Sequence, residues 1–188
     1  MKLPAKIKDE MAQLDSTTYN HSIRVWKLAL GVEEYYRMED DSLSTAAFVH
    51  DIGKLYISPE ILDKHESFTE LERELVNLHP YIGYRILEEG SVSEIVRRIV
   101  LYHHGMNPKL LASLPDFYSS MVESKAKMLH TIDAFEALTT DRPYRRRMSV
   151  KQAAAFLREQ EGCHRQVLRF LRENIHDFEA MTSEGISM

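Results

Sequence analysis

Residues 46–54 read AAFVHDIGK, and the fold is organised around this stretch. An apolar run delivers His50 and Asp51 side by side, and Gly53 then breaks the helix before Lys54. Adjacent helical residues point about 100° apart, but at a helix end they can converge on one point, and a metal ion is a common reason for that. The alternative is a plain helix C-terminus with Gly53 as the residue that follows the cap.

The composition is that of an ordinary globular domain. The chain has 188 residues, of which 44% are hydrophobic and 28% charged, enough to bury one core. Its net charge of −5 argues against a general affinity for nucleic acids or anionic membranes. The single cysteine excludes an internal disulfide and fits a reducing cytosol. Because neither a long apolar run nor a signal sequence is visible, we expect a cytoplasmic protein.

The predicted fold class is all-α, a single helical bundle. Seven Gly and six Pro are few, and no segment alternates apolar and polar residues over the length of a strand. We expect a lead-in helix over 1–14, one domain over 15–178 and a frayed tail over 179–188. The spacing and caps predict helices over 15–38, 42–51, 59–62, 66–78, 80–90, 91–104, 122–139, 149–160 and from 162 to about 178.

Three further local features are expected. Ser67 and Glu70 fit a capping box at the start of the 66–78 helix. Lys54 is placed in a loop, and 105–121 reads as an irregular loop or lid whose apolar residues could contact a regulatory protein partner.

A set of histidines and aspartates predicts a metal centre. Asp133 is the most informative, because it interrupts an apolar helix face where an unpaired carboxylate costs several kcal/mol. An ion pair with Arg97, Arg98 or Arg142 would satisfy it equally well. The candidate ligands are His21, His50, Asp51, His79, His103, His104 and Asp133.

The joint pattern carries this prediction, since His21 alone or a His-His pair alone reads more simply as structural. The other four histidines lack a neighbouring ligand pattern and are interpreted as surface or structural. Imidazole and carboxylate ligands suit Mn, Fe, Co, Ni or Zn better than Ca or Mg. We expect two ions of Fe or Mn, with Ni, Co and Zn as alternatives. Seven ligands are too many for one ion, whereas two ions about 3.5–4 Å apart could share a carboxylate and hydrolyse a phosphate ester.

The ordered motifs resemble the HD phosphohydrolase superfamily, and within it the HD-GYP branch. The resemblance covers roughly residues 15–175. The stretch from Asp133 to Arg145, DAFEALTTDRPYR, is also very close to the branch. The matching motifs are His21, His50-Asp51 followed by Gly53-Lys54, His79-Pro80 followed by Gly83, His103-His104, and Asp133.

The resemblance implies an all-helical, metal-dependent phosphodiesterase that hydrolyses cyclic di-GMP, a nucleotide second messenger. It implies one ion held by His21, His50, Asp51 and Asp133, and a second held by His79, His103 and His104 with Asp51 bridging. Asp51 and Lys54 would be catalytic, with Lys54 contacting the scissile phosphate or protonating the leaving oxygen. Lys54, Arg142 and Arg145 would bind substrate.

The chain departs from the branch at two places. No Gly-Tyr-Pro follows the His-His pair, where the chain reads GMNP over 105–108. Thr17 stands where three-metal members have an extra glutamate, which favours two metals. Two alternatives follow: hydrolysis of another nucleotide or phosphoester, and a non-catalytic module that binds a nucleotide or a partner.

Overall fold

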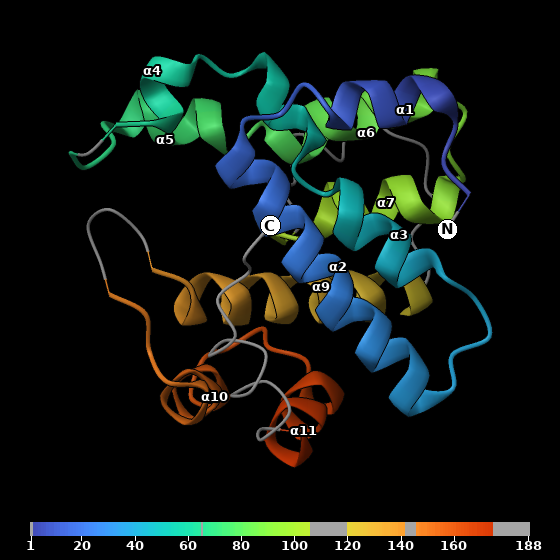
Figure 1. Ribbon diagram of the computed structural model, residues 1–188, viewed down its shortest axis with the longest axis vertical. Coiled ribbons are helices and arrows are strands. Elements are labelled where there is room, and N and C mark those ends of the chain that lie inside the picture. Colours follow the sequence, from blue (N-terminus) through green and yellow to red (C-terminus); the bar gives the residue numbers. More distant parts are fainter. Residues whose placement is uncertain (1, 65, 106–119, 142–145, 175–188) are drawn as a thin grey trace.

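Helices make up the regular structure throughout the described part of the chain. The computed structural model describes residues 2–64, 66–105, 120–141 and 146–174. Within these ranges no strand occurs, which confirms the predicted all-α class (Figure 1). None of the helices described is both long and apolar enough to cross a membrane. The elements are α1 (Ala5–Met11), α2 (Ser16–Tyr36), α3 (Ser42–Val49), the 3₁₀ helix η1 (Ile52–Tyr56), α4 (Pro59–Leu62), α5 (Glu70–Val76), α6 (His79–Glu89), α7 (Glu94–Tyr102), α9 (Ser120–Thr139), α10 (Val150–Arg158) and α11 (Arg165–Glu173).

Four helices form the centre of the bundle. α3 packs against α2, α7 and α9, and α9 also packs against α2 and α7. Every residue of α3 is buried, which explains why its sequence is apolar or small throughout rather than amphipathic. Figure 1 shows α2 crossing α9, with α3 and α7 beside them. The segment that follows α3 therefore begins deep inside the molecule.

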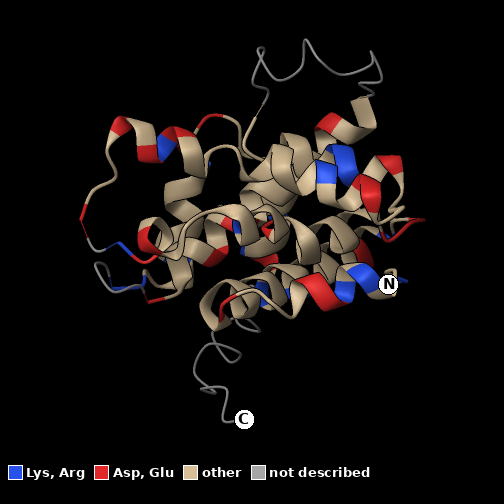
Figure 2. Cartoon of the chain, turned by 90° about the horizontal axis from the view of Figure 1, so that it is seen from above, with Lys and Arg blue, Asp and Glu red and all other residues tan. Residues whose placement is uncertain are grey.

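The remaining helices cover this centre from two sides. α6 packs on η1 and α7, whereas α10 and α11 pack on α9. Figure 1 places these two groups at opposite ends of the view. Figure 2 shows Lys and Arg interspersed with Asp and Glu along the helices, as expected for a solvated surface rather than a broad basic face.

Several predicted boundaries are confirmed. Asp15 caps α2, and its carboxylate accepts a hydrogen bond of 2.9 Å from the Thr18 backbone N–H. Proline occupies the first turn of both α4 and α6, where its missing N–H costs nothing. α6 ends at Gly90, as the sequence indicates.

Other boundaries were wrong. The capping box of α5 is Thr69 with Glu72, not Ser67 with Glu70, so the helix is shorter than 66–78. Both pairs fit the Ser/Thr-x-x-Glu pattern, and the ion pair between Lys64 and Glu72, at 2.7 Å, supports the second. Lys54 lies in the 3₁₀ helix η1 rather than in a loop. The last helix ends at Glu173, before the predicted Phe178.

Candidate metal centre

The seven predicted ligands converge from five helical segments. His21 lies within α2 and Asp133 within α9, whereas the others lie where helices begin or end. His50 and Asp51 join α3 to η1, and the histidine pair follows α7. Their ligand atoms form three overlapping groups, each with all atoms within 4.8 Å of one another: His21, His50 and Asp133; His50, Asp51 and His103; His79, His103 and His104.

Gly53 brings two of these segments together. A Cβ built on Gly53 would lie 2.0 Å from the His79 carbonyl oxygen and 2.7 Å from the Gly83 backbone nitrogen. No side chain fits against backbone at that distance, so η1 can lie on the first turn of α6 only because residue 53 is glycine. The helix does not simply end at a glycine cap, and the close approach places Asp51 beside His79.

We call His21, His50 and Asp133 the first half of the centre. The Nε2 atom of His21 lies 3.0 Å from Oδ1 of Asp133, and the Nε2 atom of His50 lies 3.9 Å from the same oxygen. His50 is 1% exposed and His21 8% exposed. One carboxylate and two imidazoles thus face a shared point, with the Asp133 side chain 16% exposed.

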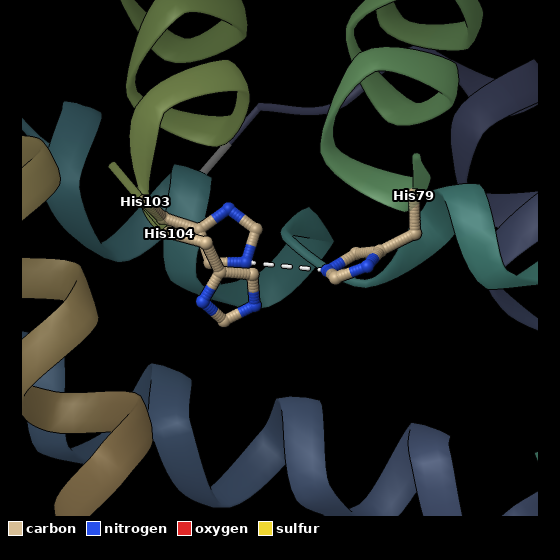
Figure 3. Close-up of side chains that lie close together, drawn as sticks. All are labelled: His79, His103 and His104. Carbon is tan, nitrogen blue, oxygen red and sulfur yellow. Dashed lines mark hydrogen bonds between the residues drawn. The ribbon is translucent and has the colours of Figure 1, made fainter. Parts of the chain in front are cut away.

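We call His79, His103 and His104 the second half. Figure 3 shows the three imidazoles facing one another, with His79 on one side and the His103-His104 pair on the other. The Nε2 atoms of His79 and His103 are 3.4 Å apart. The rings of His103 and His104 have centroids 3.9 Å apart.

Three histidines are oriented by the same kind of hydrogen bond, from the ring to a backbone carbonyl. Nδ1 of His50, His79 and His103 lies 2.8, 2.7 and 2.6 Å from the backbone carbonyl three residues earlier. A carbonyl oxygen only accepts, so each Nδ1 carries the hydrogen and each Nε2 of the neutral ring keeps a lone pair.

These unprotonated Nε2 atoms are suited to bind a metal ion. In the described part of the chain, the buried Nε2 of His50 has no hydrogen-bond partner. The lone pairs of His79 and His103 face each other, which is unfavourable unless a cation lies between them. A metal-binding histidine characteristically gives its other N–H to a carbonyl or carboxylate. The described residues therefore supply clusters that could hold divalent metal.

Asp51 lies between the halves. Its Oδ2 is 3.5 Å from Nε2 of His50 and 3.7 Å from Nε2 of His21, whereas its Oδ1 is 3.3 Å from Nε2 of His79. The Lys54 ammonium donates to the same Oδ2 at 2.7 Å. Each carboxylate oxygen of Asp51 thus faces a different half.

The protonation of the two halves differs. Burial opposes ionisation of Asp51, but the adjacent Lys54 ammonium holds the pKa of this carboxyl well below its ordinary value. Burial would lower the pKa of His21, but hydrogen bonds to Asp133 and Glu136 raise it to about 10.

In the second half, burial lowers the pKa of His79 to about 4 and that of His103 well below its ordinary value. Without metal, the first half holds an imidazolium, and the second half holds neutral rings.

The alternative partners considered for Asp133 are engaged elsewhere or lie outside the described residues. Arg97 contacts Glu88 at 2.9 Å, and Arg98 contacts Glu94 at 2.5 Å. Arg142 and Arg145, predicted to bind substrate, lie outside the described residues, as do residues 106–119 of the predicted partner loop.

The sequence reasoning missed Glu136 and Arg24. Glu136 is 3% exposed, and its Oε2 lies 2.5 Å from Nδ1 of His21. Its other oxygen accepts from Nε of Arg24. The signal was present in the spacing, because His21 and Arg24 are three residues apart on α2, and Asp133 and Glu136 three apart on α9. Such pairs share a helix face.

A cavity of about 420 Å³ opens beside the first half. His21 and Asp51 reach it, and the cations Arg24, Lys54 and Lys64 also line it. It has the volume of a small-molecule site, and its lining carries charges of both signs, with Asp15, Asp63 and Asp141 among the acidic residues.

The HD domain family model matches residues 18–149 of this chain. The chain belongs to the HD domain family. The HD domain of the phosphodiesterase PgpH from L. monocytogenes superposes with a TM-score of 0.67 at 19% identity, over 94% of this chain and 98% of that one. The same domain in complex with cyclic-di-AMP gives a TM-score of 0.68 at 20% identity, over 97% and 99% of the two chains. At this identity the likeness shows the HD fold.

Curated relatives of this HD domain are named as phosphodiesterases. Cyclic di-GMP phosphodiesterase PA4108 of Pseudomonas aeruginosa is 30% identical over 157 residues, covering 79% of this chain and 36% of the relative. The cyclic di-GMP phosphodiesterase response regulator RpfG of Xanthomonas campestris is 32% identical, over 64% and 32% of the two chains. The 3'3'-cGAMP-specific phosphodiesterase 3 of Vibrio cholerae is 31% identical, over 62% and 25%. The chain thus spans about a third or less of these relatives.

Proposed function

We propose that this chain is a metal-dependent phosphodiesterase that hydrolyses a cyclic dinucleotide, with cyclic di-GMP as the first substrate to test. The observation that carries the proposal is the convergence of unprotonated imidazole nitrogens and buried carboxylates beside a cavity of about 420 Å³. The relatives named above as cyclic di-GMP phosphodiesterases support this choice of substrate.

The proposed site holds two ions. His21, His50 and Asp133 would bind the first, and the second half would bind the other. Asp51 would bridge them, because its two oxygens face different halves at 3.3–3.7 Å from ring nitrogens. Nitrogen and oxygen donors without a thiolate suit Fe, Mn, Ni, Co or Zn, and of these Fe or Mn is the proposed pair.

Two bound ions supply an activated water and stabilise charge on the attacking and leaving oxygens. The chain's own groups bind and orient the phosphodiester. Lys54 lines the cavity with its side chain 24% exposed, so its ammonium can contact the scissile phosphate or donate a proton to the leaving oxygen. Lys64 also lines the cavity, and its ammonium is paired with Glu72 at 2.7 Å.

Turnover of a defined panel tests the proposal. Protein loaded with Mn²⁺ is incubated with cyclic di-GMP, 3'3'-cGAMP, cyclic di-AMP and bis(p-nitrophenyl) phosphate, and the products are separated by chromatography. We expect cyclic di-GMP to be converted to the linear dinucleotide or GMP. Preferred cleavage of 3'3'-cGAMP would identify that dinucleotide as the substrate in place of cyclic di-GMP, in agreement with the name of the Vibrio cholerae relative. No hydrolysis of any panel member by metal-loaded protein would contradict the proposal.

A further inference from the structure

His21 is oriented differently from the other three histidines described above. Those three give their Nδ1–H to a backbone carbonyl three residues earlier. Their rings lie at helix ends, where carbonyl groups are available. His21 lies inside α2, where helical hydrogen bonds already use the carbonyls. Its Nδ1 instead faces Oε2 of Glu136 at 2.5 Å.

Glu136 is itself held on both oxygens. Oε2 accepts from His21, whereas Oε1 accepts from Nε of Arg24 and from the Thr140 hydroxyl at 2.7 Å. The side chain of Glu136 is 4% exposed, so water does not compete for it. A buried carboxylate with three charge-assisted or hydroxyl donors is fixed in position and remains ionised.

Two residues of α2, one helical turn apart, contact carboxylates of α9. His21 reaches Asp133 with Nε2 at 3.0 Å and Glu136 with Nδ1. Arg24, one turn further along α2, reaches the same glutamate. The imidazole is therefore fixed at both nitrogens, and its plane and tautomer are set by Glu136.

We propose that Glu136 is a positioning residue that holds the Nδ1–H tautomer of His21 and thereby presents Nε2 to the ion of the first half. This inference rests on the proposed two-ion site. Carboxylate–histidine–metal arrangements hold the ring and increase its donor strength. Because Glu136 touches His21 and none of the second-half histidines, its effect is confined to the first half.

The test is a metal-binding measurement on Glu136→Gln. Glutamine keeps the size of the side chain but places an NH₂ group against either Arg24 or Nδ1 of His21, where a donor now faces a donor. Binding of Mn²⁺ is followed by the EPR signal of the free ion in wild-type protein and in the variant. We expect the first-half affinity to fall about 10–100-fold and the second-half affinity to stay within about threefold.

Two further backgrounds assign the effect to His21. In a His103→Ala/His104→Ala background, which isolates the first half, Glu136→Gln should again weaken binding about 10–100-fold. In a His21→Ala background it should change binding less than about threefold, because the ring it positions is gone. Glu123→Gln, on the same helix and paired with Lys127 at 2.7 Å, is the matched control and should leave both affinities unchanged.

A merely structural role for Glu136 predicts a different result. If Glu136→Gln weakened both halves equally, or weakened binding as much in the His21→Ala background, the inference would be overturned. Unchanged first-half affinity would also overturn it. Glu136→Asp, which retains the charge, should recover part of the loss, and thermal unfolding of the metal-free variants shows whether they remain folded.

The outcome is separable from that of the proposed function. Mn²⁺ binding needs no substrate, so a selective loss in Glu136→Gln supports the inference even if cyclic di-GMP is not cleaved. Turnover by wild-type protein with unchanged metal binding in Glu136→Gln overturns the inference and leaves the proposed function in place. Wild-type protein that binds none of Mn²⁺, Fe²⁺, Co²⁺, Ni²⁺ and Zn²⁺ at either half overturns both.

Discussion

The two halves of the metal centre use similar ligands in different electrostatic settings. The first half contains Asp133 and is backed by Glu136, so without metal it keeps a proton on His21, whose pKa is raised to about 10. The second half consists of imidazoles backed by backbone carbonyls, and burial lowers the pKa of His79 to about 4. An ion that bound the first half would therefore displace a proton, whereas the second half is already deprotonated.

Under the proposed two-ion arrangement, the fold prepares the two sites separately. Carboxylates raise the attraction for a cation but also for a proton, whereas neutral imidazoles attract both less. Asp51 belongs to both settings, because one of its oxygens faces each half. Changes at the shared residue should therefore have the largest effect, and changes outside both halves the smallest.

The largest effect is expected from Asp51→Ala, which removes the shared ligand. Loss of an indirect metal contact already costs about 10–100-fold, so loss of the bridging carboxylate should reduce hydrolysis by more than about 100-fold. Both ions should also bind more weakly. Steady-state hydrolysis and metal content measure the two effects, with Asp9→Ala on the exposed face of α1 as the control. Loss of only one ion would contradict the bridging position.

Gly53→Ala should displace η1 from α6 and thereby move Asp51 away from the second half. The new methyl would meet the backbone of α6 at 2.0 Å, so η1 and α6 must move apart. We expect a loss of about 3 kcal/mol in the free energy of unfolding, typical of severe overpacking, and weaker binding at the second half. Gly31→Ala is the matched control, because its methyl would meet only the tip of the Phe170 ring, at 2.9 Å, which can shift.

Urea unfolding of both glycine variants provides the measurement. Gly31→Ala should change the free energy of unfolding by less than about 1 kcal/mol, since alanine also favours the helix. Equal destabilisation by the two variants would show that the contact of η1 with α6 has no special role.

The pH dependence of metal binding should distinguish the halves. His21 is protonated below a pKa of about 10, so an ion at the first half must displace that proton. Its apparent affinity should rise about tenfold per pH unit between pH 6 and 8. His79 is neutral above a pKa of about 4, so the second half should show little change over the same range. Mn²⁺ titrations at three pH values measure both slopes, and equal slopes would contradict the comparison.

The smallest effect is expected from Asp40→Asn, which lies outside both halves. Asp40 accepts from the buried Lys125 ammonium at 2.6 Å just before α3. Burial alone would raise its pKa, but the hydrogen bonds from Lys125 and Ser42 lower it to about 2. This contribution is therefore complete above the unfolded pKa of about 4 and is lost as the pH falls towards 2.

Solvent screens this partly exposed pair, so Asp40→Asn should cost at most about 1 kcal/mol at pH 7. The difference from wild type should shrink between pH 4 and pH 2, and the ratio of the two metal affinities should stay unchanged. Urea unfolding across this pH range checks the first point. A difference that grows on acidification would contradict the assigned pKa.

The candidate ligands could be selected from the sequence because they occur at helix ends and inside apolar faces. His50 and Asp51 follow a fully apolar run, and Asp133 interrupts one, so their chemistry conflicts with their surroundings and is visible in one sequence. The structure brings these residues close together, and the binding of metal by them remains a proposal. The residue boundaries of the domain also remain predictions.

What the sequence did not reveal depends on contacts between helices. Glu136 reads as an ordinary helical glutamate until α2 is known to lie against α9, where His21 and Arg24 face it. The choice between Ser67 and Thr69 as a cap likewise depends on a partner, since Lys64 holds Glu72. Local patterns were ambiguous wherever the deciding interaction came from another segment.

Metal content per chain tests the central claim most directly. The protein is purified untagged and anaerobically, and transition metals are counted by elemental analysis in wild type and in His103→Ala/His104→Ala. We predict two equivalents in wild type and no more than one in the variant, because the first half remains intact. One equivalent that the variant leaves unchanged, or no metal even after reconstitution, would contradict a centre built from two halves.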